Sequence, residues 1–189
     1  MKYCSQCASE LVITIPDGDN RERHVCPACQ TIFYQNPRIV AGTIPVYQGK
    51  VLLCRRAIEP RRGLWTLPAG FMENGESTEE AALRETLEEA QACVDIRSLF
   101  SVITVPHIDQ VHIFFLAEMS TPEFGAGEES LDVQLFSPED IPWDEMAFPT
   151  VNKTLNLWLK DDSPTQPTYV FDIRTPYKKP EEVLAEQRL

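Results

Sequence analysis

Six glutamates lie close together in one short segment of the chain. They are Glu76, Glu79, Glu80, Glu85, Glu88 and Glu89. If this segment is helical, Glu85, Glu88 and Glu89 are three and four positions apart and share one face. Like charges at that spacing destabilise an isolated helix by roughly 0.2–0.5 kcal/mol per pair. The face is therefore either an ordinary solvated acidic surface or the binding site of a divalent cation.

Four cysteines form a second group of possible metal ligands. Cys4 and Cys7 make one Cys-x-x-Cys pair, and Cys26 and Cys29 make another. The distance between the pairs fits the ~15–20 residue linker of a four-cysteine zinc site. Four thiolates leave no open coordination position, so the zinc would be structural. A disulfide framework is more typical of short secreted chains, and a redox motif does not account for two matched pairs.

Composition narrows the class of protein. The chain has 189 residues, 43% of them hydrophobic, and a formal net charge of −12. Such an acidic chain is a poor candidate for non-specific binding to nucleic acid or a membrane surface. The sequence has no apolar run near the ~18 residues of a membrane span, and its N-terminus does not resemble a signal peptide. We therefore expect a cytoplasmic protein whose partners include neither nucleic acid nor membrane.

Hydrophobic patterning predicts an α+β fold. The segments 38–47 and 50–56 are expected strands joined by a Gln48-Gly49 turn, and 98–105 and 111–119 are further strands. Between these strand pairs, residues 63–71 are expected to form a short strand that leads into a loop.

Two helices are also predicted. Ser77 and Glu80 form a capping box that opens a helix through the acidic segment. Val151, Leu155 and Trp158 follow the spacing of an amphipathic helix. Three regions result: a zinc ribbon at 1–34, a main domain at 35–162 and a peripheral tail at 163–189. Cys54 and Cys93 are expected to be buried.

The segment GFMENGESTEEAALRETLEEAQA, residues 70–92, resembles the Nudix box. The residues that carry the resemblance are Gly70, Glu76, Arg84, Glu85, Glu88 and Glu89. The preceding GLWTLPAGF is also similar to the approach to that box, and the resemblance covers about residues 37–160. With four cysteines in front, the chain resembles the zinc-ribbon Nudix subgroup, which includes FAD and ADP-ribose pyrophosphatases.

This resemblance implies a fold and a reaction. The fold would be an α/β/α sandwich with a mixed sheet, often as a homodimer. The reaction would be Mg²⁺- or Mn²⁺-dependent hydrolysis of a nucleoside diphosphate linked to another group, with FAD or ADP-ribose as the expected substrate and AMP as a product. Glu85 and Glu89 would be direct Mg²⁺ ligands, and Glu88 a ligand or a water-mediated partner. Arg84 would orient Glu76; a surface pair with Glu80 or Glu88 is the other interpretation, and the two are not exclusive.

Further site residues are expected outside the box. Glu129 occupies the place of a later glutamate that serves relatives as a metal ligand or general base; Glu128 and a merely solvated acid are the alternatives. Arg55 and Arg56 are candidates to meet substrate phosphates, unless they are a solvated strand end. Phe71 is a candidate to stack on a base or flavin ring.

Two box positions depart from the family pattern, and other functions stay open. Thr86 replaces an aliphatic residue, and Gln91 replaces a glycine that suits a left-handed helix end. The SQPWPFPxS element of NADH pyrophosphatases is not found in the sequence, which lowers NADH as a substrate. A triphosphate-sanitising enzyme, an ADP-ribose sensor without turnover and an RNA- or protein-binding ribbon protein are the remaining alternatives.

Overall fold

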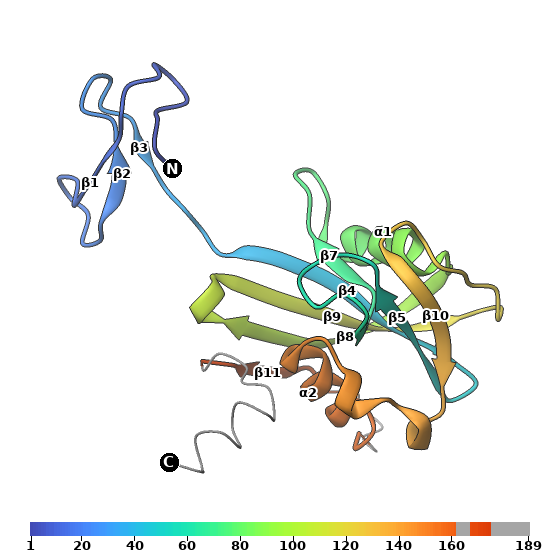
Figure 1. Ribbon diagram of the computed structural model, residues 1–189. Helices are drawn as coiled ribbons and strands as arrows, with labels where there is room; N and C mark the ends of the chain where they lie inside the picture. The colour runs from blue at the N-terminus through green and yellow to red at the C-terminus, as the bar shows by residue number, and fades with distance from the viewer. Residues whose placement is uncertain (162–166, 175–189) are drawn as a thin grey trace, which may run out of the picture. The chain divides into compact units, whose positions relative to one another are not determined.

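The computed structural model describes residues 1–161 and 167–174 (Figure 1). The chain divides into two compact units, Met1–Pro37 and Arg38–Leu189. Most of the expected tail at 163–189 lies outside the described residues.

The first unit is a small three-stranded antiparallel sheet. Its strands are β1 (Val12–Thr14), β2 (Arg23–Val25) and β3 (Ile32–Phe33), in that order across the sheet. The Pro-Asp-Gly-Asp-Asn turn makes β1 and β2 a hairpin. Arg23 Nε donates to Asp19 Oδ2 at 2.9 Å across that turn. So little sheet holds almost no core, and such small units depend on an additional staple such as a metal.

The second unit is built on a mixed eight-stranded sheet. Its main order is β10-β5-β4-β9-β8-β11, with β6 paired to β5 and β7 paired to β4. The bounds are β4 (Arg38–Tyr47), β5 (Lys50–Arg56), β6 (Trp65–Thr66), β7 (Ala69–Phe71), β8 (Val94–Val105), β9 (Gln110–Met119), β10 (Ser130–Phe136) and β11 (Tyr169–Asp172). The β4/β9 and β8/β11 pairs are parallel and the others antiparallel. The mixed sheet was expected.

Two helices cover opposite faces of this sheet (Figure 1). They are α1 (Thr78–Ala90) and α2 (Pro149–Trp158), and three short 3₁₀ helices are η1 (Pro106–Ile108), η2 (Pro138–Asp140) and η3 (Trp143–Glu145). Strand alternation separates two layers. Ala41 and Phe115 pack with α1, whereas Ile44 and Phe114 pack in the cluster that contains Leu155 of α2. The α/β/α sandwich is therefore confirmed. Within the described residues, no helix is long and apolar enough to cross a membrane.

Several elements differ from expectation. β8 begins at Val94, and β10 and β11 were not foreseen. β11 forms only because Tyr169–Asp172 pairs with the distant Ser101–Thr104, which no local pattern announces. Cys54 is buried as expected, but Cys93 is exposed, because it lies in the turn after α1 rather than in a strand.

Candidate active site and metal sites

The four cysteines of the first unit converge on one point. Within the described residues they are the one group of three or more potential ligands whose donor atoms all lie within 4.8 Å of one another. The Sγ–Sγ distances are 3.4 Å for Cys7–Cys26 and 3.6 Å for both Cys4–Cys29 and Cys7–Cys29. A tetrahedral zinc with ~2.3 Å bonds separates its sulfurs by about 3.8 Å. The sulfurs are free thiols, so the geometry is that of a zinc ribbon and not of a disulfide pair.

Backbone hydrogen bonds preorganise this cluster. Cys4 N donates to Ser9 O and Ala8 N donates to Cys4 O, both at 2.9 Å. Cys26 N to Thr31 O and Gln30 N to Cys26 O repeat the same pattern at 2.9 and 2.8 Å. The two Cys-x-x-Cys pairs therefore lie in turns with the same pattern of backbone hydrogen bonds. Hydrogen bonds with Thr31 lower the pKa of the Cys29 thiol to about 6, which favours the thiolate that metals bind.

Helix α1 begins and ends as the sequence predicted. Ser77 Oγ accepts from Glu80 N, and Ser77 N donates to Glu80 Oε2 at 2.7 Å, which is the complete capping box. Gln91 ends the helix in the left-handed conformation, with φ 48°. The buried Thr86 hydroxyl lies 2.6 Å from Thr43 Oγ1 on β4 and donates to Ala82 O at 2.7 Å. A threonine is accommodated in this core because its hydroxyl is paired.

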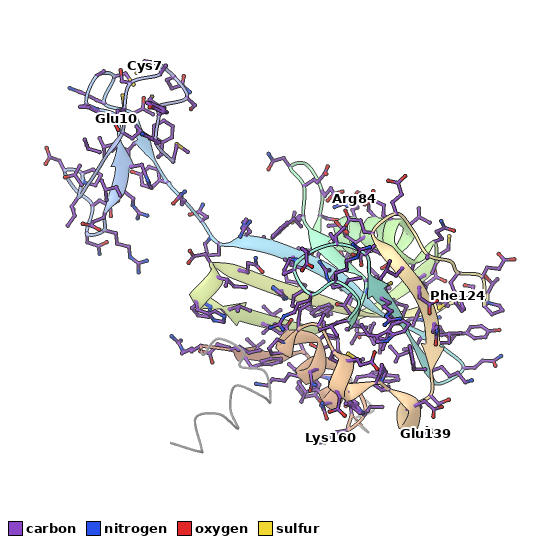
Figure 2. The ribbon with its side chains drawn as sticks, in the orientation of Figure 1. Cys7, Glu10, Arg84, Phe124, Glu139 and Lys160 are labelled. Atoms are coloured by element: carbon purple, nitrogen blue, oxygen red, sulfur yellow. The ribbon has the colours of Figure 1, made fainter. Side chains whose placement is uncertain are left out.

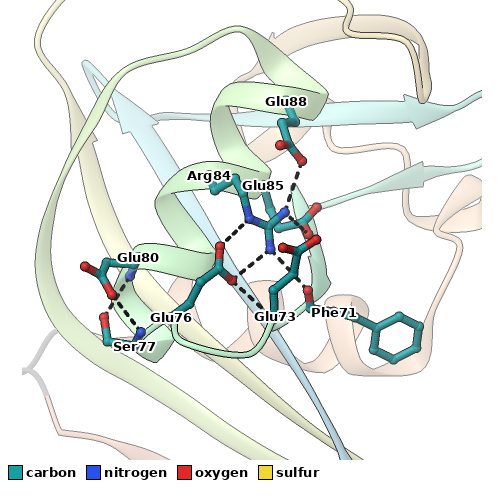
Figure 3. Close-up of polar contacts among 8 residues, drawn as sticks. All are labelled: Phe71, Glu73, Glu76, Ser77, Glu80, Arg84, Glu85 and Glu88. Carbon is teal, nitrogen blue, oxygen red and sulfur yellow. Dashed lines mark hydrogen bonds and ion pairs between the residues drawn. The ribbon is translucent and has the colours of Figure 1, made fainter.

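Arg84 is the centre of the polar contacts around the box (Figure 3). Its guanidinium grips both oxygens of Glu76, at 2.6 and 3.0 Å. It also donates to Glu85 Oε1 at 2.7 Å, to Glu88 Oε2 at 3.0 Å and to Phe71 O at 3.1 Å. The Arg84 hydrogen bonds lower the pKa of Glu76 to about 2. Arg84 thus joins α1 to the loop before it. Of the partners expected from the sequence, Arg84 pairs with Glu76 and Glu88 and not with Glu80.

Glycine at position 70 makes room for the Glu85 carboxylate. A Cβ added to Gly70 would lie 2.3 Å from both carboxylate oxygens of Glu85, too close for any side chain. The carboxylate therefore rests directly on the backbone of β7. Burial raises the pKa of Glu85, although its pair with Arg84 opposes that effect.

Glu89 is the most buried carboxylate of the segment. It is 5% exposed, and its Oε2 accepts a 3.0 Å hydrogen bond from Ala69 N. Burial raises its pKa to about 8, with a further contribution from Glu85 and Glu129 and an opposing one from Arg56. Within the described residues no cation forms an ion pair with it. A buried carboxylate without a paired cation is costly as an anion, so this position favours a bound divalent cation.

The three box carboxylates are not gathered as closely as the cysteines. Arg84 holds Glu85 and Glu88 while Ala69 N holds Glu89, so they do not form a cluster within 4.8 Å. Carboxylate oxygens are nevertheless the donors that Mg²⁺ and Mn²⁺ prefer. The donor set and the unpaired burial of Glu89 therefore fit a hard divalent cation.

The two arginines of β5 have different surroundings. Arg55 Nε donates to Gly63 O at 2.8 Å on an exposed surface, and Arg56 Nε donates to Pro60 O at 2.9 Å. Successive strand residues point to opposite faces, and Arg56 is among the main electrostatic influences on Glu89. The structure thus brings Arg56, but not Arg55, toward the buried carboxylate.

Glu129 lies in the segment Phe124–Glu129, hereafter the Glu129 loop. Its carboxylate is exposed but near enough to Glu85 and Glu89 to raise the pKa of each. The neighbouring Glu128 is not among the main influences on either pKa. Of the two glutamates considered from sequence, the geometry therefore favours Glu129 as a member of the carboxylate group.

Two aromatic side chains close to the box, Phe71 and Trp65, differ in their exposure to solvent. Phe71 is 47% exposed, and Figure 3 shows its ring turned away from Arg84. Arg38 Cζ lies 4.7 Å from the centre of that ring, so the Arg38 guanidinium already covers one face of it. Trp65 is buried and meets Phe136 edge to face at 4.9 Å, which makes it a core residue.

A cavity of about 220 Å³ was missed by the sequence analysis. Its lining comes from the loop before β6, from η1, from β9 and from the start of α2, and includes Arg61, His107, His112, Phe148 and Thr150. The Thr150 hydroxyl is buried without a hydrogen-bond partner. Arg56 connects this region to the carboxylates, since its guanidinium lies 5.1 Å from the Phe148 ring centre. These residues are far apart in sequence, so no motif could reveal the cavity.

Comparison with protein families matches the NUDIX domain to residues 36–158 and the Nudix N-terminal family to residues 2–35. A crystal structure of a NUDIX hydrolase from Nitrosomonas europaea superposes with a TM-score of 0.88 at 48% identity, covering 93% of this chain and all of that one. A MutT NUDIX hydrolase from Burkholderia pseudomallei shares 27% identity with a TM-score of 0.57, covering 65% of this chain and 98% of that one.

Two curated relatives carry functional names. One is an ADP-ribose pyrophosphatase from Methanocaldococcus jannaschii, 31% identical over 61% of this chain and 69% of its own length. Another is the NAD-capped RNA hydrolase NudC of Chromobacterium violaceum, 35% identical over 62% of this chain but only 42% of its own length. The family match spans most of the chain and includes the helix that bears the carboxylates. The chain therefore belongs to the Nudix family and is a Nudix hydrolase with an N-terminal zinc ribbon.

Proposed function

We propose that this enzyme hydrolyses a nucleoside diphosphate linked to a second organic group, with Mg²⁺ or Mn²⁺ held by Glu85, Glu88 and Glu89. ADP-ribose is the preferred substrate and FAD the next. The products are AMP plus ribose 5-phosphate from ADP-ribose, or AMP plus FMN from FAD.

The burial of Glu89 is the observation that carries this proposal. A carboxylate that is 5% exposed and has no paired cation needs a positive partner to remain charged. Glu85 and Glu129 add negative charge next to it. A site with this charge distribution suits the metal complex of a diphosphate, whereas a free diphosphate would be repelled.

A divalent cation held by Glu85, Glu88 and Glu89 would neutralise the diphosphate and lower the pKa of the attacking water. The chain's own residues hold the remaining groups. Arg84 fixes Glu76 and orients Glu85, while Gly70 leaves space for the Glu85 carboxylate. Glu129 takes the proton of the attacking water as general base. The new bond joins that water oxygen to one phosphorus, and the bond from this phosphorus to the bridging oxygen breaks.

Arg56 and Phe71 are proposed to contact the substrate. The Arg56 guanidinium lies 5.1 Å from the Phe148 ring centre and acts electrostatically on Glu89, which suits it to bind a phosphate oxygen. Arg55 is proposed as a weaker, peripheral phosphate contact because its guanidinium faces solvent. Phe71 offers an exposed ring for an aromatic group of the substrate.

Product analysis tests the reaction. Purified enzyme with Mg²⁺ or Mn²⁺ is offered ADP-ribose, FAD, NADH, NAD-capped RNA and nucleoside triphosphates, and the products are identified by chromatography and mass spectrometry. AMP and ribose 5-phosphate from ADP-ribose at the highest kcat/KM support the proposal. A preference for NADH, for a capped RNA or for a triphosphate would replace the substrate. Metal-dependent binding of ADP-ribose without cleavage would instead indicate a sensor.

The adjacent Glu128 provides a matched control for the general base. Glu129→Gln should lower kcat by a factor on the order of 10²–10⁴. Glu128→Gln should retain activity, because Glu129 and not Glu128 is among the main electrostatic influences on the buried carboxylates. Equal activities for the two variants would remove Glu129 from the mechanism.

We also propose one Zn²⁺ per chain at the four cysteines and a homodimer in solution. The sulfur geometry supports the zinc. The exposed Leu83 and Leu87, one turn apart on α1, offer apolar surface to a second copy. Light scattering coupled to gel filtration checks the dimer, and a monomeric mass at micromolar concentration would rule it out.

A further inference from the structure

The Glu129 loop is attached to the C-terminal end of α1. Gly125 N donates to Ala90 O at 2.8 Å, and Gly127 N donates to Glu89 O at 3.1 Å. These carbonyls belong to the last turn of the helix, where no further intrahelical donor is available. The loop therefore supplies the missing donors. Its position is fixed directly by the helix that carries the box carboxylates.

The approach of loop and helix is too close for side chains. A Cβ at Gly127 would lie 1.7 Å from Glu88 O, so only glycine fits there. Beyond Gly127 the chain is held on its other side, because Ala57 N donates to Glu129 O at 2.7 Å. Phe124, at the start of the loop, packs against the cluster that contains Ala90 (Figure 2). The backbone of Glu129 is thus fixed between α1 and the residue after β5.

Gln91 adds a side-chain contact to this junction. Its amide Nε2 donates to Ala126 O at 3.2 Å, and its Oε1 lies only 2.9 Å from where a Cβ of Gly125 would be. The contact is made from a left-handed backbone, φ 48° and ψ 29°, that a side chain disfavours. A glycine would relieve that strain but could not reach the loop.

We propose that Gln91 is a positioning residue that clamps the Glu129 loop onto the end of α1, and so sets the place of the Glu129 carboxylate relative to Glu85 and Glu89. The residue contacts no substrate. It acts through the loop backbone, and this inference rests on the proposed role of Glu129 in diphosphate hydrolysis. A displacement of a catalytic group by 1 Å lowers the rate about a hundredfold, so one amide hydrogen bond that holds the loop can determine the rate.

The chain contains a matched control for the backbone strain. Gln48 has the same residue type and the same φ of 48°, but it lies in the turn between β4 and β5. Within the described part of the chain, its side-chain amide reaches only its neighbour, Tyr47 Oη, at 3.4 Å. Gln48→Gly and Gln91→Gly therefore remove the same strain, and only the second removes the clamp.

Hydrogen–deuterium exchange measures the clamp without any reference to activity. In zinc-loaded full-length protein, Gln91→Gly and Gln91→Glu should accelerate exchange at Gly125 and Gly127 by about tenfold or more relative to wild type. Gln91→Glu keeps the size of the side chain but replaces the amide donor by an acceptor facing Ala126 O. Gln48→Gly should leave this loop unchanged. Wild-type exchange of the loop in both Gln91 variants would overturn the proposal.

Kinetics then tests whether the clamp acts through Glu129. With ADP-ribose, Gln91→Glu should lower kcat by about tenfold or more with little change in KM, because no substrate contact is lost. In a Glu129→Gln background the same change should have almost no further effect. An equal loss of kcat in both backgrounds would show that Gln91 does not act through Glu129 and would overturn the proposal.

The failure of the proposed function has a different signature. If wild-type enzyme cleaved no diphosphate, or if Glu129→Gln left kcat unchanged, the general base would be misassigned. The exchange comparison would still decide whether Gln91 holds the loop.

Discussion

The two candidate metal sites of this protein present their ligands in opposite ways. In the ribbon, matching sets of backbone hydrogen bonds hold four thiols within 4.8 Å of one another. On α1, the carboxylates are held apart by Arg84 and by Ala69 N. The short cysteine side chains on two matching turns are aimed at one point by the backbone. Long glutamate side chains on a helix accept whichever donor is nearest, so their arrangement depends on what is bound.

The difference suits two tasks. A structural ion needs a closed, preformed shell. A catalytic ion must exchange ligands with water and substrate, so its protein ligands need only be few and correctly oriented. We therefore expect removal of metal to have unequal consequences at the two sites.

Zinc removal should give the largest effect. Structural zinc contributes about 10–16 kcal/mol of apparent binding free energy at pH 7 in comparable small folds. Chelation should unfold residues 1–37 while residues 38–161 keep their amide protection, as followed by two-dimensional NMR. Elemental analysis should find one zinc per chain. Absence of zinc, or disulfides in freshly purified protein, would show that the four cysteines are not a structural zinc site.

Loss of a single carboxylate should abolish activity without unfolding the protein. Glu89→Gln and Glu88→Gln should each lower the kcat for Mg²⁺-dependent hydrolysis by about a hundredfold or more. Melting without Mg²⁺ should be unchanged or higher, since a buried or repelling charge has been removed. Steady-state kinetics and calorimetry measure both. Near-wild-type kcat in either variant would exclude that glutamate from the site.

The pH dependence of stability should reveal the buried carboxylate. The pKa of Glu89 is raised to about 8, so folding is favoured by its proton. That stabilisation is complete below the ordinary glutamate pKa and is lost as pH rises through about 8. Between pH 5 and pH 8, zinc-loaded protein without Mg²⁺ should lose at most about 1.4 kcal/mol per pH unit.

Two controls isolate this effect. Glu89→Gln should flatten the profile, and Mg²⁺ should stabilise the wild type most at the higher pH. Glu76 does not interfere, because its lowered pKa of about 2 makes its own contribution constant above the ordinary glutamate range. If the free energy of unfolding of the wild type did not change with pH, Glu89 would be charged in the folded protein and its charge would be stabilised without an added metal.

The anchor of the carboxylate helix can be tested at Thr86. Thr86→Val should cost about 1–3 kcal/mol because it leaves the buried Thr43 hydroxyl without that partner. The double change Thr43→Val with Thr86→Val should recover part of the loss, since both hydroxyls are then gone. Urea unfolding supplies the free energies. A double variant less stable than the single one would show that the pair is not an isolated unit.

The smallest expected effect concerns strain at the helix end. Gln48→Gly should stabilise the protein by roughly 0.5–1 kcal/mol by relieving a left-handed φ. Gln91→Gly should gain less, because the hydrogen bond to Ala126 O is lost with the strain. Thermal melts of both variants provide the comparison. A larger gain at Gln91 than at Gln48 would mean that the amide contact contributes nothing to stability.

Local sequence was sufficient wherever neighbours in the chain determine the structure. The two Cys-x-x-Cys turns, the Ser77 capping box, the helix end at Gln91 and the turn after Tyr47 all appear as predicted. Each depends on contacts within a few residues, which spacing and residue type encode directly. The ordered residues of the box, likewise, were enough to indicate the family.

Only the tertiary structure decided how distant parts meet. Sequence could not distinguish Arg55 from Arg56, or Glu128 from Glu129, since adjacent residues of one type differ only in the direction they face. Burial of Glu89, the pairing of Thr86 with Thr43 and the cavity beside Phe148 all require segments brought together by the sheet. The clamp from Gln91 to Ala126 spans 35 positions. Such contacts depend on chain topology, because only folding decides which distant side chains are buried next to one another.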